Sequence, residues 1–366
     1  MSQIIQAHTS APIQRTERGL NYDKVLRAIK AIGASRDPGE VAEWKAMNEE
    51  VLGLKAASGA ILHNYVINTM SVAYQNDAYI GERLMPTVNL NGRLAGSYYS
   101  YTKRDSLGYP DDSMAERANA NELTRTKTLV NVSLTPRALR EYVDELTLNN
   151  PEQPLNELVE ASANALEGLA FLKEKRIAAV IGASANYGSN TTAIAAASRW
   201  DVGGDPVADI IAMMPGIWSG RGPTKLVGFT SLAVWNVLRQ HPRILDLFKF
   251  NGNSPGLAAP SMLAGWFGLD ELLIGSAWQD TANEGQTAVY AKIWPDVFGV
   301  VRVAQNPGSR SASWGVTFQD RAAAEVDTTY SSERGTDGGW YARAKVSDSS
   351  AIIAADTGWL LTTVIG

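Results

Sequence analysis

The stretch from Tyr101 to Lys127 reads YTKRDSLGYPDDSMAERANANELTRTK and is polar, rich in turn-forming residues and almost free of apolar side chains. Strand-like sequence flanks it on both sides. A hydrophilic excursion of this length adds little to the core of its own subunit, so it needs either water or the surface of a partner around it. The role of this stretch therefore decides how the rest of the chain is interpreted.

The flanking segments predict the two strands of a long hairpin. Before the polar stretch, RLMPTVNLNGRLAGSYYSY has the composition of β-structure. After it, LTRTKTLVNVSLTP alternates, with Val130, Val132 and Leu134 on one face, and we expect this strand to end at Pro136. Because an isolated two-stranded hairpin is marginally stable in water, a projecting one must contact something larger.

The amino-terminal part predicts two short amphipathic helices, at 22–33 and from Asp37-Pro38 to Val51. Short helices need an apolar surface supplied from elsewhere. They are either ordinary core helices of this subunit or an arm that docks on a neighbour.

The segment Pro154–Ile181 predicts a long helix, because apolar residues recur near one face and acidic residues precede basic ones, in the order that the helix dipole favours. The apolar positions are Leu155, Leu158, Val159, Leu166, Leu169 and Leu172.

The middle of the chain predicts a mixed α/β domain. Asp205-Pro206 opens a helix, KLVGF at 225–229 reads as a buried strand, and Ser231 starts a helix that should end at His241-Pro242. From Trp314 the sequence is strand-like again. We expect the final strands to pair with earlier ones and to pack on the long helix, so that one domain is assembled from residues before and after the middle one.

Composition sets the class of protein. The chain has 366 residues, 45% of them hydrophobic, a net charge of -5 and no cysteine. This charge gives no case for tight nucleic-acid binding, so DNA would be contacted loosely, and disulfides and thiolate metal sites are excluded. The opening MSQIIQAHTSAPIQRTERG lacks the features of a signal peptide and no apolar run is long enough to span a bilayer, so we expect a soluble, cytoplasmic product without membrane contact.

The sequence predicts no catalytic, cofactor-binding or metal site. The histidines, His8, His63 and His241, lack metal-ligand spacing, and SGRGPT at 219–224 lacks the third glycine of a dinucleotide fingerprint. The acid pair Asp111-Asp112 reads as a solvated turn, and Asp270-Glu271 as a helix terminus. Nothing here favours an enzyme.

Taken in order, these parts resemble a tailed-phage major capsid protein of the Hong Kong 97-like fold, an α+β fold. The resemblance spans nearly the whole chain and includes Pro86-x-Val88 before Gly96-x-Tyr98 and the closing AIIAADTGWLL. It implies an amino-terminal helical arm at 1–85 and an extended β-hairpin loop at 86–136. It further implies a peripheral domain from 137–203 and 304–366, with a spine helix at about 154–181, and an axial domain at 204–303.

The resemblance also implies a function. The chain would be a structural protein, not an enzyme, that self-assembles into hexamers and pentamers of an icosahedral phage head around double-stranded DNA. Assembly would take place in the host cytoplasm and the product would be part of the virion. Scaffolding, portal and decoration proteins are the further partners implied, with packaged DNA contacted without sequence specificity.

In this family the extended loop lies across a neighbouring subunit of the same capsomer, which gives the polar stretch its role. The resemblance implies intersubunit contacts from six charged residues of the loop. Some members also form a Lys–Asn crosslink, for which Lys103 or Lys127 is a conceivable donor, but assembly without crosslinks is expected. The six contact residues are Lys103, Arg104, Asp111, Asp112, Glu116 and Arg117.

Two alternatives stay open at this point. One is an encapsulin-type compartment shell protein, which has the same fold but typically a shorter amino-terminal region. The other is an enzyme on an unrelated α/β scaffold, which would be a discrete oligomer with a deep polar cleft.

Overall fold

The computed structural model describes residues 62–63, 79–101, 109–113, 119, 121–122, 126–149, 157–218, 224–248, 258–304, 307 and 313–366. The helices predicted at 22–33 and 37–51 lie outside these residues. The described elements from α5 onward belong to one compact unit, His63–Gly366. The first described strand is β1 (Leu62–His63).

The described helices are mostly short, with one long exception. They are α5 (Gly81–Leu84), α7 (Glu145–Leu148), α8 (Glu157–Gly182), α9 (Pro206–Met213), α10 (Leu232–Leu238), α11 (Pro242–Phe248) and α12 (Pro260–Trp266). Single 3₁₀ turns occur at η1 (Ser184–Tyr187), η2 (Ala196–Ser198), η3 (Met214–Gly216) and η4 (Ala355–Thr357).

Side-chain caps start two helices where the sequence predicts them. The Asp205 carboxylate accepts hydrogen bonds from the backbone N–H groups of Val207 and Ala208 at the start of α9. The Ser231 hydroxyl accepts one from the N–H of Val234 at the start of α10, which ends at Leu238, before His241. Such caps satisfy N–H groups that have no partner within the helix. Both helix predictions are confirmed.

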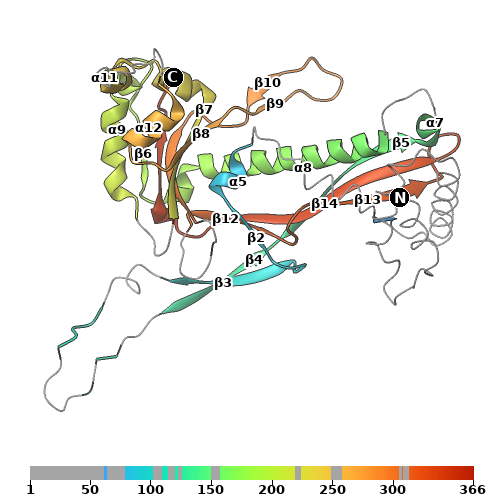
Figure 1. Ribbon diagram of the computed structural model, residues 1–366, viewed down its shortest axis with the longest axis horizontal. Coiled ribbons are helices and arrows are strands. Elements are labelled where there is room, and N and C mark those ends of the chain that lie inside the picture. Colours follow the sequence, from blue (N-terminus) through green and yellow to red (C-terminus); the bar gives the residue numbers. More distant parts are fainter. Residues whose placement is uncertain are drawn as a thin grey trace, which may run out of the picture. The chain divides into compact units, whose positions relative to one another are not determined.

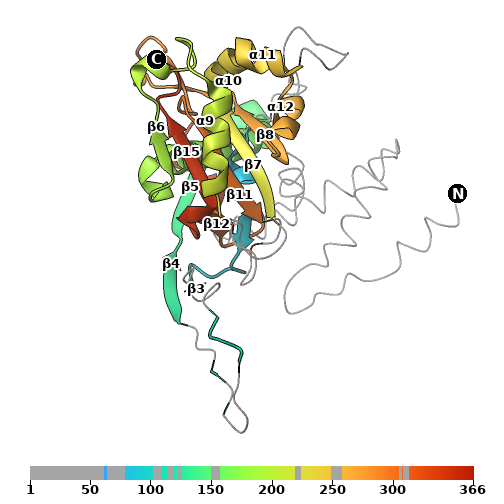
Figure 2. The same cartoon turned by 90° about the vertical axis from the view of Figure 1, so that its left-hand side faces the viewer.

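A five-stranded mixed sheet forms the first layer. Its order is β6-β15-β11-β7-β8, with β6 parallel to β15, β7 parallel to β8, and the other pairs antiparallel. Figure 2 shows α9 and α10 lying over the face of this sheet that is turned toward the viewer. The strands are β6 (Thr191–Ala193), β15 (Gly358–Thr362), β11 (Phe298–Ala304), β7 (Thr224–Ser231) and β8 (Glu271–Gly275).

Alternation along β11 separates two cores. Phe298 and Val300 are buried against the helices α9 to α12, whereas Val301 is buried on the other face, against the carboxyl-terminal end of α8. Gly299 lies between Phe298 and Val300, at a position where an added Cβ would be 2.3 Å from the ring of Phe229. A side chain at this position would therefore overpack the second core, and glycine lets the aromatic ring fill the space.

The second layer, the β14 sheet, is built around β14 (Gly339–Ile352). Strands β13 and β12 pair, one after the other, with one edge of β14. Strand β5 pairs with the same residues of β14 and therefore lies along its other edge. Beyond β12, β2 adds a parallel strand. Figure 1 shows α8 running alongside β14 and β5. The partner strands are β13 (Glu325–Ser331), β12 (Gly315–Gln319), β2 (Thr87–Asn89) and β5 (Thr135–Asp144).

The strand around Pro136 has different bounds from those that the sequence predicts. The strand was expected to end at Pro136, but β5 begins at Thr135 and continues to Asp144, with Pro136 opposite Ser347 of β14. Among the described strands β5 pairs with β14 alone, so it is an edge strand, where the missing N–H of proline costs no ladder hydrogen bond. Likewise β2 belongs to the β14 sheet rather than to the projecting hairpin.

The buried face of α8 is narrower and lined by smaller residues than the sequence predicts. The helix itself is confirmed, but Leu172 is exposed, while Ala161, Ala165 and Leu169 face the β14 sheet. At Gly168 an added Cβ would be 2.7 Å from Leu139 of β5. Because the helix axis lies close to the sheet, small residues occupy the contact. The spacing of leucines in the sequence therefore predicts a wider buried face than α8 has.

The terminal strand meets its expectation with one face only. The final strands were expected to pack on the long helix, which would bring side chains of β15 against α8. Leu360 faces the helix, since it is buried in one core with Ile177 and Ile181 of α8. Trp359 points to the opposite side of β15, half-buried in the other core, because neighbouring residues of a strand face opposite ways. Strands β6 and β15, expected with the long helix, belong to the five-stranded sheet.

The acid pair Asp270-Glu271 lies at the start of β8, not at a helix terminus. The Asp270 carboxylate accepts a hydrogen bond from the backbone N–H of Leu226, 2.7 Å away, which fixes the start of the neighbouring strand β7. Glu271 forms an ion pair with Arg83. Both carboxylates therefore have partners within the subunit and a structural role. Among the described residues, no helix is long and apolar enough to cross a membrane.

Candidate assembly surfaces

The predicted hairpin is present as a two-stranded ribbon. Strand β3 (Ala95–Tyr101) pairs antiparallel with β4 (Lys127–Ser133) along the full length of both strands. Figures 1 and 2 both show the ribbon extending away from the two sheets. The prediction that two strands bracket the polar stretch is confirmed.

The inner face of the ribbon is anchored at its base. Tyr98 stacks on Phe318 of β12 with ring centroids 5.9 Å apart, and Val132 and Leu134 are buried beside them. The predicted alternation from Val130 to Leu134 is thus confirmed. Burial of this kind contributes about 1.5–3 kcal/mol for each fully buried large side chain. The base is therefore part of the subunit core, while the distal part is not.

The outer face of the ribbon carries an exposed apolar pair. Tyr99 and Leu129 lie directly opposite each other in the register, and they are 59% and 53% exposed. The Lys127 ammonium is 5.9 Å from the centre of the Tyr99 ring. Together, Tyr99, Lys127 and Leu129 form a surface that we call the outer ribbon face.

Near the tip, the structure describes two of the six charged residues implied as intersubunit contacts. Asp111 and Asp112 are both exposed, which confirms the solvated-turn interpretation. The Asp111 carboxylate accepts hydrogen bonds from the backbone N–H and the hydroxyl of Ser113, and the hydroxyl is the larger cause of a lowered Asp111 pKa. The Asn121 amide donates to the Asp111 carbonyl at 2.7 Å. The other four, Lys103, Arg104, Glu116 and Arg117, lie outside the described residues.

A second ribbon leaves the five-stranded sheet between β8 and β11. Strands β9 (Trp278–Asp280) and β10 (Tyr290–Lys292) pair antiparallel and form a sheet of their own. Figure 1 shows this ribbon projecting on the side of α8 away from β3 and β4.

Glu174 is a buried acidic residue with three hydrogen-bond donors, and the sequence analysis did not single it out. Its residue is 2% exposed, and its carboxylate accepts hydrogen bonds from the backbone N–H groups of Ile80 and Gly81, at 3.0 and 2.8 Å. A third comes from the indole N–H of Trp294, at 2.9 Å. Burial is the largest influence and raises the Glu174 pKa, while the three donors act in the opposite direction. The carboxylate joins three distant segments.

A buried ion-pair network joins α8 to the β14 sheet. The Asp348 carboxylate on β14 lies 2.5 Å from the Arg137 guanidinium of β5 and 2.6 Å from that of Arg176 on α8. The Asp348 side chain is almost fully buried, and a charge in that position needs such partners. Arg176 therefore holds the helix against the sheet, and Arg137 joins β5 to β14.

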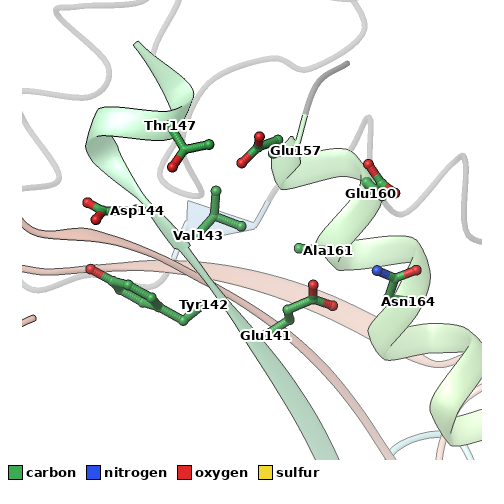
Figure 3. Close-up of a pocket in the computed structure, with 9 residues that line it drawn as sticks. All are labelled: Glu141, Tyr142, Val143, Asp144, Thr147, Glu157, Glu160, Ala161 and Asn164. Atoms are coloured by element: carbon green, nitrogen blue, oxygen red, sulfur yellow. The ribbon is translucent and has the colours of Figure 1, made fainter. Parts of the chain in front are cut away.

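An open hollow of 380 Å³ lies between β5, α7 and the start of α8 (Figure 3). Four carboxylates line it, from Glu141, Asp144, Glu157 and Glu160. Figure 3 shows Glu141 pointing toward α8, while Tyr142 points to the other side of the strand. No cluster of His, Asp and Glu able to hold a metal ion occurs in the part of the chain that the structure describes.

Comparisons with known proteins identify the fold. No protein-family model matches the chain. It is 23% identical over 269 residues to the major capsid protein of Burkholderia phage BcepMu, which covers 72% of this chain and 85% of the relative. A phage-related protein from Bordetella bronchiseptica RB50 is similar with a TM-score of 0.65 and 17% identity, over 83% of this chain and 98% of the other.

A phage capsid protein of known structure is also similar to this chain. The capsid chain of cyanophage P-SCSP1u is similar with a TM-score of 0.51 and 10% identity, over 79% of this chain and 89% of that one. This chain therefore has the Hong Kong 97-like capsid fold, an α+β fold, as its sequence predicts. The resemblance to tailed-phage major capsid proteins is confirmed.

Proposed function

We propose that this chain is the major capsid protein of a tailed phage, which assembles with copies of itself into the hexamers and pentamers of an icosahedral head. The observation that carries the proposal is the projecting β3–β4 ribbon, anchored in the subunit at Tyr98 and bare on its outer face at Tyr99 and Leu129. An exposed apolar face on a projecting ribbon needs a partner surface. The capsid fold and the phage relative support the same role.

Each part of the chain has a place in this proposal. The β3–β4 ribbon and the polar stretch beyond it form the extended loop. Helix α8, packed on the β14 sheet, is the spine of a peripheral domain, and the five-stranded sheet with α9 to α12 is an axial domain. Because β6 and β15 belong to the five-stranded sheet, the axial domain then includes Thr191–Ala193 and Gly358–Thr362 besides 204–303. The arm at 1–85 completes the division, and its last part, at α5, packs in the core beside α8.

The proposed partners follow from the same role. The principal partner is a second copy of the chain, within a virion assembled in the host cytoplasm. Scaffolding, portal and decoration proteins are further partners, and packaged DNA is contacted without sequence specificity, in keeping with the net charge of -5. The role is structural rather than catalytic, and it requires no cofactor.

The encapsulin alternative is less favoured, because the curated relative is a phage capsid protein and more than ninety residues precede the ribbon, whose first strand begins at Ala95. An unrelated α/β enzyme is disfavoured by the capsid fold itself.

Negative-stain electron microscopy of the purified full chain tests the proposal. We expect rings or closed shells, alone or after co-expression with a phage scaffolding protein. A homogeneous population of small, discrete oligomers under both conditions would contradict the proposal. Shells that contain double-stranded DNA when isolated from an induced host would separate a phage head from a compartment shell.

A further inference from the structure

The β9–β10 ribbon has two chemically different faces. The register places Trp278 opposite Lys292 and Asp280 opposite Tyr290, so these four side chains share one face. Trp278 and Tyr290 on that face are 52% and 71% exposed. The other face carries Gln279 and Ala291, which are half-buried.

The exposed face is also acidic. The Asp280 carboxylate accepts hydrogen bonds from the backbone N–H groups of Ala282 and Val289, both at 2.9 Å, and these bonds lower its pKa. Asp280 therefore stays charged at neutral pH. The one base on this face, Lys292, lies 3.2 Å from the Asp296 carboxylate, which offsets its charge. Together, Trp278, Asp280 and Tyr290 form a surface that we call the acidic aromatic face.

This face needs a partner. A short two-stranded ribbon gains little stability in water by itself, and exposed Trp and Tyr side chains next to one another are typical of protein–protein contacts. The outer ribbon face of β3–β4 is its counterpart in chemistry: Tyr99 and Leu129 are apolar, and Lys127 is basic.

The two faces cannot meet within one subunit. Figures 1 and 2 share the vertical axis, and Figure 1 shows the two ribbons on opposite sides of α8 along that axis. A contact between them must therefore join two copies of the chain. Because two different surfaces meet, the contact is heterologous, and a heterologous contact that closes generates a ring.

We infer that the acidic aromatic face of one subunit is the receptor for the outer ribbon face of the next subunit in the capsomer. The inference rests on the proposed function and names the surface of the neighbouring subunit that the extended loop binds. Lys127 then lies near Asp280, and Tyr99 and Leu129 cover the rings of Trp278 and Tyr290. The proposed contact is repeated at every subunit of the ring.

Disulfide crosslinking tests the contact, and the chain suits it because it contains no cysteine. Shells are assembled from a Leu129→Cys, Tyr290→Cys double variant, oxidised, and run on a denaturing gel without reductant. We expect a ladder of covalent oligomers that ends at the ring size. The matched control pairs Leu129→Cys with Val202→Cys, another exposed site, and should remain monomeric on the gel.

The single variants exclude a symmetric contact. If Tyr290→Cys alone gave covalent dimers at high yield, the acidic aromatic face would bind its own copy and the inference would be wrong. Shells of the double variant without crosslinks above the control would also overturn it, while leaving the proposed function intact. Absence of shells from the unmodified chain would instead contradict the proposed function.

A measurement on the unmodified protein avoids dependence on any variant. Hydroxyl-radical labelling read by mass spectrometry compares dissociated subunits with shells. We expect labelling of Tyr99, Trp278 and Tyr290 to fall at least several-fold on assembly, whereas Tyr330, which lies on neither face, should change less. Undiminished labelling of Trp278 and Tyr290 in shells would overturn the inference.

Discussion

The carboxylate of Glu174 on α8 accepts a hydrogen bond from the indole nitrogen of Trp294, at 2.9 Å, although 120 residues separate them in the sequence. The same carboxylate holds the backbone of Ile80 and Gly81 where α5 begins. One buried side chain thus ties two segments to the long helix: the one that leads into the extended loop and the one that leads into β11 of the five-stranded sheet. The position of the loop base depends on this link.

Replacing Glu174 with glutamine should lower the free energy of unfolding by about 1–3 kcal/mol, because the amide NH₂ would oppose one of the buried N–H donors and leave it unsatisfied. Chemical denaturation of the dissociated subunit measures the loss. The control is Lys175→Gln, a change at the exposed neighbouring position, which should stay within about 0.5 kcal/mol. Equal effects of the two changes would show that the Glu174 hydrogen bonds add nothing to stability.

The effect of Glu174→Gln should also depend on pH. Burial raises the pKa of this carboxyl above its ordinary 4.5, so the folded protein holds the proton more tightly than the unfolded chain. The part of the Glu174 contribution that comes from this pKa shift is then complete below 4.5 and is lost as the pH rises through the raised pKa. The difference in unfolding free energy between the unmodified protein and the variant should therefore shrink with rising pH. A difference that grows instead would mean that the hydrogen bonds outweigh burial and lower the pKa.

The two faces of β15 give a paired prediction. Leu360→Ala should cost about 2–5 kcal/mol, because it opens a cavity beside Ile177 and Ile181 of α8. Trp359→Ala should cost less than the roughly 3–5 kcal/mol of a fully buried tryptophan, because the ring is half-buried and rests on Gly216 near the surface. Thermal unfolding of the dissociated subunit ranks the two. A larger loss for Trp359→Ala would contradict the assignment of the faces.

Local sequence signals predicted those parts of the fold that depend on neighbours in the chain. The caps at Asp205 and Ser231, the alternation from Val130 to Leu134 and the long helix all follow from such patterns. The order of these parts was sufficient to indicate the capsid fold.

Features that depend on contacts between distant segments could not be predicted in the same way. Glu174 looks like any acidic residue of a helix, and its donors come from residues about 90 and 120 positions away. Leu172 matches the leucine spacing of α8 but lies beyond the narrow strip that the sheet covers. The acidic aromatic face went unnoticed because the projection of β9 and β10 depends on where the five-stranded sheet ends.

Single charge reversals at the tip should have small effects on assembly. Asp111 and Asp112 are exposed, and screened contacts between exposed charges are individually weak. Light scattering of assembly should show a modest change in rate for Asp112→Lys, and the change should shrink as salt rises. A reversal that abolishes assembly even at high salt would instead assign a buried, specific contact to this residue.

The most direct test of the account is the assembly state of a variant in which residues 107–121 are replaced by a short glycine-containing turn. None of the described residues in this span contributes to the hydrophobic cores, and shortening a loop changes its closure entropy by about 0.6 kcal/mol for each halving of its length. We predict a circular dichroism spectrum and melting temperature close to those of the unmodified subunit, together with sedimentation velocity that shows loss of capsomers and shells. A folded variant that still builds normal shells would contradict the claim that the extended loop holds neighbouring subunits together, and an unfolded variant would place the stretch inside the subunit's own core.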